Sequence, residues 1–183
     1  MVLKIAIFGG SFDPPHIGHQ KIVEKALELL DIDTLFVVPT FLSPFKESFS
    51  APAPMRLLWL QTLFAKTPKT TVLSFECDQQ RQVPTIETVL HVKSLYPKAH
   101  IYLIMGSDAF SSLHLWRRHD ELSALVEYVV ATRNRSAYPA DLKILPINVN
   151  ISSSKLREVF DEEYIPSSIR ARVKAYYLKE KNG

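Results

Sequence analysis

Short apolar segments alternate along the chain with longer segments whose apolar positions recur every three or four residues. Residues 2–8 are mostly β-branched or otherwise apolar, and residues 17–30 follow with apolar positions at helical spacing. The first pattern is typical of a buried strand and the second predicts a helix. By the same criteria we predict further strands at 34–38, 71–75, 100–105, 126–131 and 142–145. Further helices are predicted at 55–64, 86–95, 152–160 and 166–181.

The order of these elements predicts an α/β fold. Strands that are apolar throughout need cover on both faces, which parallel strands receive from the helices that connect them. We therefore expect a Rossmann-like, doubly wound parallel sheet with helices on both faces. With 183 residues, 46% of them hydrophobic, the chain fits one domain spanning residues 1–183.

The polar segments after the predicted strands are where a ligand is expected. In doubly wound sheets, ligands bind beyond the carboxyl ends of the strands, where the strand order reverses. Four segments follow predicted strands: Gly9–His19, Pro39–Thr40, Gly106–Asp108 and Thr132–Arg133. We expect these strand ends to line one cleft. Residues 40–53 are rich in proline and serine and predict a long loop.

The segment G-G-S-F-D-P-P-H-I-G-H at 9–19 joins the first strand to the first helix. Two glycines let the backbone approach a ligand closely, and the helix that follows directs free N–H groups toward an anion. His16 and His19 are three residues apart, so on a first helical turn both can donate to the same phosphates. The alternative is a tight turn capped by Asp13 with two incidental histidines. No H-E-x-x-H spacing or third ligand supports a zinc site.

A second hydroxyl-rich segment, I-S-S-S-K-L-R at 151–157, starts a predicted helix near the C-terminus. Its serines can cap the helix and still offer oxygens and N–H groups to an anion. Arg157 follows Ser153 and Ser154 by four and three residues and shares their helical face. A serine-rich cap with a solvated arginine is the alternative interpretation. Together with the first motif, the segment predicts a second phosphate contact.

The charge and cysteine content exclude several classes of protein. A formal net charge of +3 suits an anionic substrate but lacks the clustered basic stripe of a nucleic-acid-binding protein. The single cysteine, Cys77, excludes an internal disulfide framework and is best explained as a packing residue. No signal peptide or apolar run of about 18 residues occurs, so we expect a cytoplasmic protein without a membrane segment.

The two motifs together resemble the nucleotidyltransferase superfamily that carries T/HxGH and ISSxxxR motifs. Within it, the chain is most similar to bacterial nicotinate mononucleotide adenylyltransferases, from residue 3 to about residue 178. Gly106–Asp108 and Leu113–Trp116 are similar to the G-x-D and L-x-x-W signatures of that family. The resemblance implies that ATP and nicotinate mononucleotide react, with Mg²⁺, to give nicotinic acid adenine dinucleotide and pyrophosphate in NAD biosynthesis.

The resemblance also assigns residues to the ATP side. It implies that His16 and His19 are catalytic and contact the phosphates. It further implies that the helices from about residue 152 complete the ATP site. The ATP-binding set is Gly9, Gly10, Ser11, Phe12, Gly18, His19, Ser153, Ser154 and Arg157.

The acceptor side is assigned in the same way. Trp116 would stack on the nicotinate ring, although a core-filling tryptophan is the alternative, and Thr85 and Thr88 match two threonines at a helix start. The substrate-binding set is Thr85, Gly106, Asp108, Trp116, Arg133 and Lys46. The chain departs from the family pattern at 82–85, where a tyrosine is missing. It departs again at Phe45, where the family has histidine, and directly after Arg133.

The implied reaction is attack by the acceptor phosphate on the α phosphorus of ATP, without a covalent enzyme intermediate. The attacking phosphate is already anionic near pH 7, so alignment and charge neutralisation must supply the catalysis. Mg²⁺ commonly keeps its waters and binds substrate phosphates, so no protein metal ligand is named.

Two other functions remain open on sequence alone. Pantetheine-phosphate adenylyltransferases have similar motifs but normally carry threonine where His16 stands, and they lack the Leu113–Trp116 signature. A non-catalytic nucleotide-binding module could share the fold. The chain is too small for a class I aminoacyl-tRNA synthetase. The sequence leaves open a homo-oligomer and the choice between nicotinate and nicotinamide mononucleotide.

Overall fold

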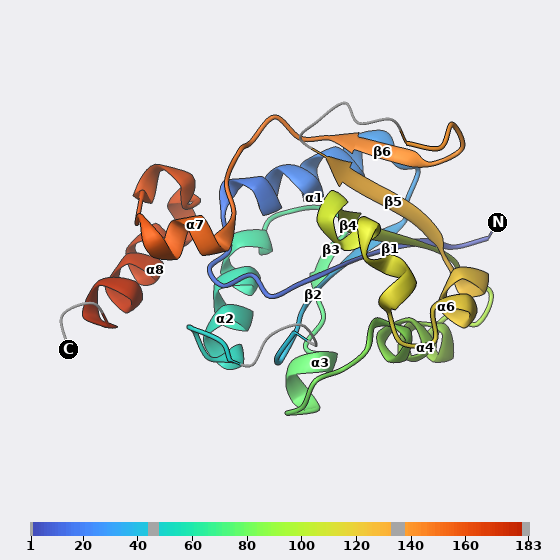
Figure 1. Ribbon diagram of the computed structural model, residues 1–183, viewed down its shortest axis with the longest axis horizontal. Coiled ribbons are helices and arrows are strands. Elements are labelled where there is room, and N and C mark those ends of the chain that lie inside the picture. The colour runs from blue at the N-terminus through green and yellow to red at the C-terminus, as the bar shows by residue number, and fades with distance from the viewer. Residues whose placement is uncertain (1, 44–47, 133–137, 181–183) are drawn as a thin grey trace.

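Six parallel strands form one sheet in the computed structural model, which describes residues 2–43, 48–132 and 138–180 (Figure 1). The sheet has the order β3-β2-β1-β4-β5-β6, and all neighbouring strands are parallel. The strands are β1 (Lys4–Gly10), β2 (Thr34–Pro39), β3 (Thr70–Val72), β4 (His100–Gly106), β5 (Glu127–Thr132) and β6 (Lys143–Pro146). The doubly wound parallel sheet predicted from the sequence is confirmed.

The strand order reverses between β1 and β4. From β1 the chain proceeds outward through β2 to β3, returns to place β4 on the other side of β1, and proceeds outward again through β5 to β6. Because parallel crossovers are right-handed, the connecting helices lie on opposite faces in the two halves. The crevice of such a sheet opens between the carboxyl ends of β1 and β4.

Two apolar cores cover the two faces of the sheet, and β1 contributes to both. Ala6 and Phe8 pack into one core, with α1 (Ile17–Leu29) and α2 (Ala53–Phe64) above them. Ile5 and Ile7 pack into the other, beneath α4 (Thr85–Leu95) and α6 (His119–Leu125). All four side chains are at most 4% exposed. Alternate residues of this buried strand thus point to opposite faces of the sheet, where they pack against the two layers of helices.

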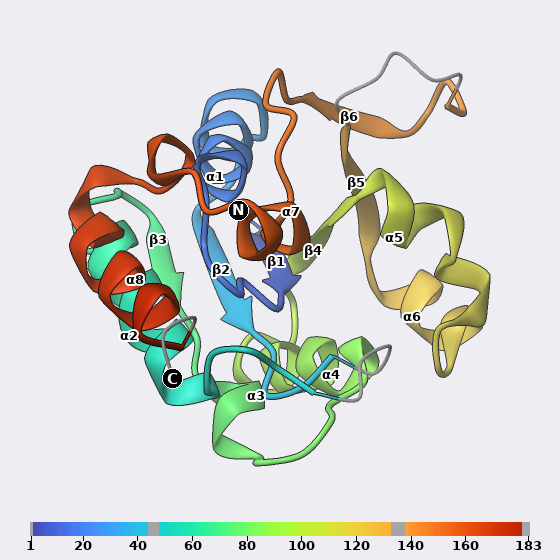
Figure 2. The same cartoon turned by 60° about the vertical axis from the view of Figure 1, so that its left-hand side comes forward.

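A third apolar cluster forms where the C-terminal helices pack on α2. Leu156 of α7 (Ser153–Glu158) lies in this cluster with Trp59 of α2. Val173 and Tyr177 of α8 (Ser167–Glu180) belong to the same cluster. Figure 2 shows α8 lying alongside α2 at the side of the molecule away from α5 and α6. Tyr177 of α8 thereby reaches Asp13, in the segment that follows β1.

The structure differs from the predicted elements mainly where segments are short. The strand predicted at 71–75 ends at Val72, because the chain turns into α3 (Phe75–Asp78). The sequence did not predict the short helices α3, α6 and α5 (Ser107–Ser111). It also did not predict the 3-10 turns η1 (Leu113–Leu115) and η2 (Glu162–Tyr164). Elements of one or two turns are too short for apolar periodicity to detect. No helix in the described part of the chain is long and apolar enough to cross a membrane.

Candidate active site

Two cavities of about 650 and 620 Å³ open at the carboxyl edge of the sheet, where the strand order reverses. They share a wall made by Gly9, Gly10, Gly106 and Asp108, at the ends of β1 and β4. A Cβ atom at Gly106 would meet no atom within 4 Å. The backbone at this end of β4 is therefore open to a ligand, and two ligands can meet across the shared wall.

The first of these, called the histidine cavity here, is lined by polar groups from both termini of the chain. Its lining includes His16 and His19, the Ser152–Ser153 pair, and Asn148 and Asn150. Ser107 at the start of α5 and Ala131 of β5 complete the side away from α1. The cavity thus joins the first motif to the segment that follows β6.

His16 and His19 hold each other through the main chain. His16 is the N-cap of α1, where its Nδ1 accepts from the Gly18 amide at 3.1 Å and the His19 Nδ1 accepts from the His16 amide at 3.2 Å. Because each Nδ1 is an acceptor, the neutral rings carry their protons on Nε2. The two rings stack with centroids 3.7 Å apart. The expectation that His16 lies on the first helical turn is wrong, since its backbone is extended, yet the rings are together.

Gly18 allows this arrangement. A Cβ atom there would lie 2.9 Å from two atoms of the His16 ring, closer than a side chain can stand. The ring is buried and held by its hydrogen bond to the Gly18 amide, so it cannot move aside freely. The glycine between the two histidines is therefore required by their packing.

The two sequence motifs converge in space. Ser153 Oγ donates to the Pro14 carbonyl oxygen at 3.0 Å, and the Arg157 guanidinium donates to the main-chain oxygen of Asp13. Ser152 caps α7 by accepting from the Lys155 amide at 3.2 Å. Segments almost 140 residues apart in sequence are thus bonded beside the histidine cavity, which Ser153 lines.

The predicted ATP-side residues are not all in this cavity. Ser154 and Arg157 line neither cavity, and the Arg157 guanidinium donates to Ser154 Oγ at 3.2 Å. Phe12 is 1% exposed, with its ring against His19 at a centroid distance of 4.8 Å. Ser11 faces the second cavity. Gly9, Gly10, Gly18, His19 and Ser153 line the histidine cavity.

The second, called the tryptophan cavity here, is lined by Trp116, Thr85 and the start of the 40–53 loop. Two of its lining residues carry a buried side-chain atom that has no hydrogen-bond partner within the described residues, Trp116 Nε1 and Thr40 Oγ1. Buried polar groups normally have a partner, so each of these two atoms needs one from water, a ligand or residues outside the described part of the chain. Thr88 is buried beneath Thr85 in α4 and donates to Glu76 instead.

Several outcomes fall outside the two predicted sets. Lys46 and Arg133 lie outside the described residues. Asp13, expected near the cleft, instead turns its carboxylate into the fold, where the Ser50 and Ala51 amides donate to it. Thr40 and Ser107 line the cavities as expected of their strand ends, and so does Ser152 of the second motif. Sequence reasoning missed the lining residues Ser43, Gln82, Ser112, Arg117, Asn148 and Asn150. For Asn148 and Asn150, the signal was their position after the predicted strand at 142–145.

The polar groups do not form a metal centre of their own. Across residues 2–43, 48–132 and 138–180, no cluster of three or more histidine, cysteine, aspartate or glutamate side chains is placed to hold an ion. Asp108 supplies the carboxylate that borders both cavities. A cation at this site would therefore depend on oxygen atoms of a ligand for most of its coordination.

Comparison with known proteins agrees with this architecture. The family model described as cytidylyltransferase-like matches residues 7–159. A Campylobacter jejuni (strain RM1221) protein named "Probable nicotinate-nucleotide adenylyltransferase" is 45% identical over 97% of this chain and 98% of its own length. A Sulfurimonas denitrificans protein of the same name is 43% identical over 96% of each chain.

The fold also matches a solved structure. The Plasmodium falciparum nicotinic acid mononucleotide adenylyltransferase complexed with NaAD superposes with a TM-score of 0.80 at 20% identity, covering 98% of this chain and 96% of that one. At that identity the match shows the fold, and the near full-length relatives show the family. The chain belongs to the cytidylyltransferase-like family and, within it, to the nicotinate-nucleotide adenylyltransferases.

Proposed function

We propose that this protein transfers the adenylyl group of ATP to nicotinate mononucleotide, giving nicotinic acid adenine dinucleotide and pyrophosphate. The observation that carries the proposal is the pair of cavities that share the wall of Gly9, Gly10, Gly106 and Asp108. A reaction that joins two nucleotides needs two adjoining sites whose ligands meet at the reacting atoms. The names of the relatives support the choice of substrates.

ATP would occupy the histidine cavity. The main-chain contacts place the ring proton of His16 and His19 on Nε2, and both side chains line this cavity, so we assign them to the phosphates. Ser153 borders the same space. Ser154 and Arg157 form a pair one turn along α7, and we assign them to the β and γ phosphates as the resemblance implies.

Nicotinate mononucleotide would occupy the tryptophan cavity. The indole of Trp116 offers an apolar face for the pyridine ring, and Thr85 stands at the first residue of α4 in the same cavity. Gly106 and Asp108 would face both nucleotides. Lys46 and Arg133 complete the proposed substrate set from the sequence alone.

The chemistry is a single displacement. An oxygen of the acceptor phosphate forms a bond to the α phosphorus of ATP, and the bond from that phosphorus to the oxygen bridging to the β phosphate breaks, releasing pyrophosphate. The nucleophile carries no proton near pH 7, so no general base is required. The enzyme contributes alignment in the two cavities and donors for the phosphoryl oxygens.

Mg²⁺ would enter with ATP, where it neutralises phosphate charge. Asp108 fits as its single carboxylate contact, directly or through water, because it borders both cavities. Asp13 does not fit, because its carboxylate oxygens already accept from Ser50, Ala51 and Tyr177.

The test is pyrophosphate release from Mg-ATP with a panel of acceptors. Release with nicotinate mononucleotide supports the proposal. Release only with phosphopantetheine would identify the related adenylyltransferase, and ATP binding without turnover would identify a binding module.

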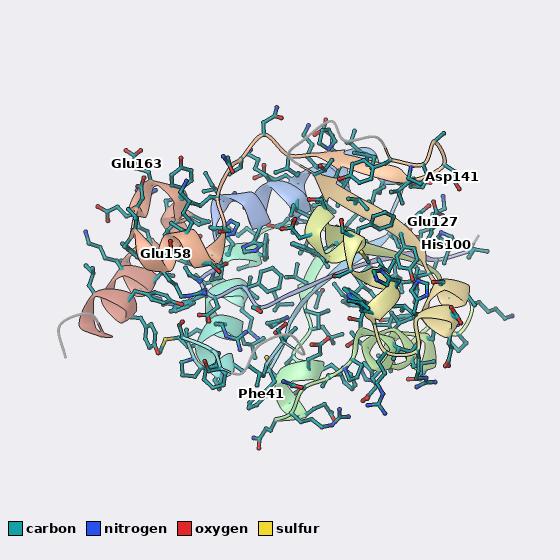
Figure 3. The ribbon with its side chains drawn as sticks, viewed as in Figure 1. Phe41, His100, Glu127, Asp141, Glu158 and Glu163 are labelled. Carbon is teal, nitrogen blue, oxygen red and sulfur yellow. The ribbon has the colours of Figure 1, made fainter. Side chains whose placement is uncertain are left out.

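A matched pair of histidine variants tests the mechanism. His19→Ala should lower kcat on the order of 100-fold or more, the usual effect of removing a transition-state donor. His100→Ala is the control, since His100 pairs with Glu127 at 2.8 Å at the amino-terminal end of the sheet (Figure 3). Near-normal kcat in His19→Ala, with an unchanged unfolding temperature, would remove His19 from the mechanism.

A further inference from the structure

The Asp13 carboxylate, three residues before His16, anchors a segment that is distant in sequence. Asp13 is 3% exposed, and its Oδ2 and Oδ1 accept from the Ser50 and Ala51 amides at 2.8 and 2.9 Å. The hydroxyl of Tyr177, in α8, donates to the same Oδ1. The carboxylate therefore ties the end of the 40–53 loop and the C-terminal helix to the first motif.

The same residue is also bonded on its main-chain side. Its carbonyl oxygen accepts from Arg157 of α7, and the next carbonyl along the chain, that of Pro14, accepts from Ser153. Asp13 is thus the point at which α7, α8, the loop and the first motif meet. A displacement of its side chain would therefore release both residues 50–51 of the loop and Tyr177 of α8.

Arg56 closes the loop from the other side. This buried guanidinium donates to four main-chain oxygens at 2.6–2.8 Å, those of Ser11, Thr40, Phe41 and Ala51. The two ends of the loop are therefore held against each other and against the first motif. Since Thr40 lines the tryptophan cavity, the position of the loop sets one wall of that cavity.

Two adjacent tyrosines of α8 complete the attachment. Tyr176 donates to the Ser50 carbonyl oxygen at 2.8 Å, while the Ser50 amide is bonded to Asp13. Burial, followed by the hydrogen bond to Asp13, raises the pKa of Tyr177, so its hydroxyl remains a donor. Figure 2 shows that α8 lies beside α2, away from α4 and α5, and these hydrogen bonds link it to the loop and to the first motif.

We propose that Tyr177 and Asp13 are positioning residues. They hold Ser50 and Ala51 and, through Arg56, residues 40–41, so that the tryptophan cavity keeps its place beside the histidine cavity. The proposal rests on the proposed function, because it assigns the loop wall to the acceptor nucleotide. His16 and His19 are held separately by their own capping bonds. A loosened loop should therefore affect the acceptor more than ATP.

The test compares Tyr177→Phe with the wild-type enzyme in two independent measurements. Removing one hydroxyl should raise KM for nicotinate mononucleotide about five- to tenfold, the effect of losing one hydrogen bond of ordinary strength, and leave KM for ATP unchanged. In hydrogen–deuterium exchange, the amides of Ser50 and Ala51 should exchange faster. Tyr128→Phe is the control, since it loses a hydroxyl contact to Ser123, 2.9 Å long, outside this network.

The outcomes separate the two proposals. Unchanged exchange at Ser50 and Ala51, an unchanged KM for the acceptor, or an equal rise in both KM values overturns the positioning role. A lowered unfolding temperature with unchanged kinetics and exchange also overturns it, because the role would then be structural only. If the wild-type protein shows no turnover, the proposed function is refuted. The positioning role is then tested by the exchange comparison on its own.

Discussion

Glu76 is a buried acid whose ionisation should make the stability of the fold depend on pH. It is 4% exposed in α3, and its Oε1 accepts from Thr88 Oγ1 at 2.6 Å. Its Oε2 has no partner within the described residues. Burial raises the pKa of Glu76 from 4.5 to about 7; the hydrogen bond from Thr88 opposes this rise, and the charge of Glu87 adds to it.

The direction and size of the effect follow from linkage. Because the pKa is raised in the folded state, the unfolded chain loses this proton first, and stability falls as pH rises from 4.5 toward 7. Above pH 7 the cost is constant. At about 1.4 kcal/mol per pKa unit, the full cost is about 3 kcal/mol. Glu76→Gln keeps the shape and the acceptor for Thr88 but cannot ionise, so it should escape this cost.

Urea unfolding at about pH 5 and about pH 8 measures the effect. The free energy of unfolding of Glu76→Gln minus that of the wild-type protein should increase by about 2–3 kcal/mol from about pH 5 to about pH 8, because only the wild-type protein loses stability. Glu163→Gln, at an exposed position of η2, is the control and should show no such difference (Figure 3). A free-energy difference between Glu76→Gln and wild type that is the same at both pH values would refute the reasoning.

Three further changes test other parts of the structure. Gly18→Ala should lower kcat at least about tenfold in steady-state assays, because its Cβ displaces the His16 ring, and an unchanged kcat would contradict the packing argument. Arg56→Lys should reduce the free energy of unfolding by about 2–4 kcal/mol in urea, because a point-charge ammonium cannot serve four carbonyl oxygens. Burial raises the pKa of the Cys77 thiol to about 11. Cys77 should therefore react slowly with an aromatic disulfide reagent in the native protein and rapidly after unfolding. A fast reaction in the native protein would show that the surroundings of Cys77 open.

The sequence predicted the sheet because its signal is repeated and long. Six apolar runs, each followed by a segment with polar residues, indicate buried parallel strands without any tertiary information. The rule that ligands bind where the strand order reverses then locates both cavities. The short helices α3, α5 and α6 were not predictable, because the fold rather than local periodicity determines them.

The cap of α1 shows another limit. Serine, threonine, aspartate and asparagine are the usual N-caps, so nothing in the sequence marked His16 as one. His16 is nevertheless the N-cap, and His19, the third residue of α1, forms the other half of a capping box. Contacts of the Asp13–Tyr177 kind, 164 residues apart, have no sequence pattern at all, since neither residue type is specific for the other.

The departure from the family pattern at 82–85 can be placed in the structure. Val83 is 3% exposed and packs inward, while Gln82, Pro84 and Thr85 line the tryptophan cavity. Pro84 stands at the position of the missing tyrosine and lines this wall, with Gln82 and Thr85 on the same wall. The acceptor specificity of this enzyme should depend on these residues more than on the histidine cavity.

The polar side chains of the first motif are held by the main chain rather than by one another. The Nδ1 atoms of His16 and His19 accept from backbone amides, as does the Asp13 carboxylate, and Arg56 donates to backbone carbonyls. A backbone fixed by strands and helices reorganises little during a reaction, so groups attached to it keep their orientation. Adenylyl transfer to an anionic phosphate requires no proton removal, and its rate depends on such fixed donors. Hydrogen bonds from these side chains to the main chain therefore suit a reaction that is catalysed by alignment.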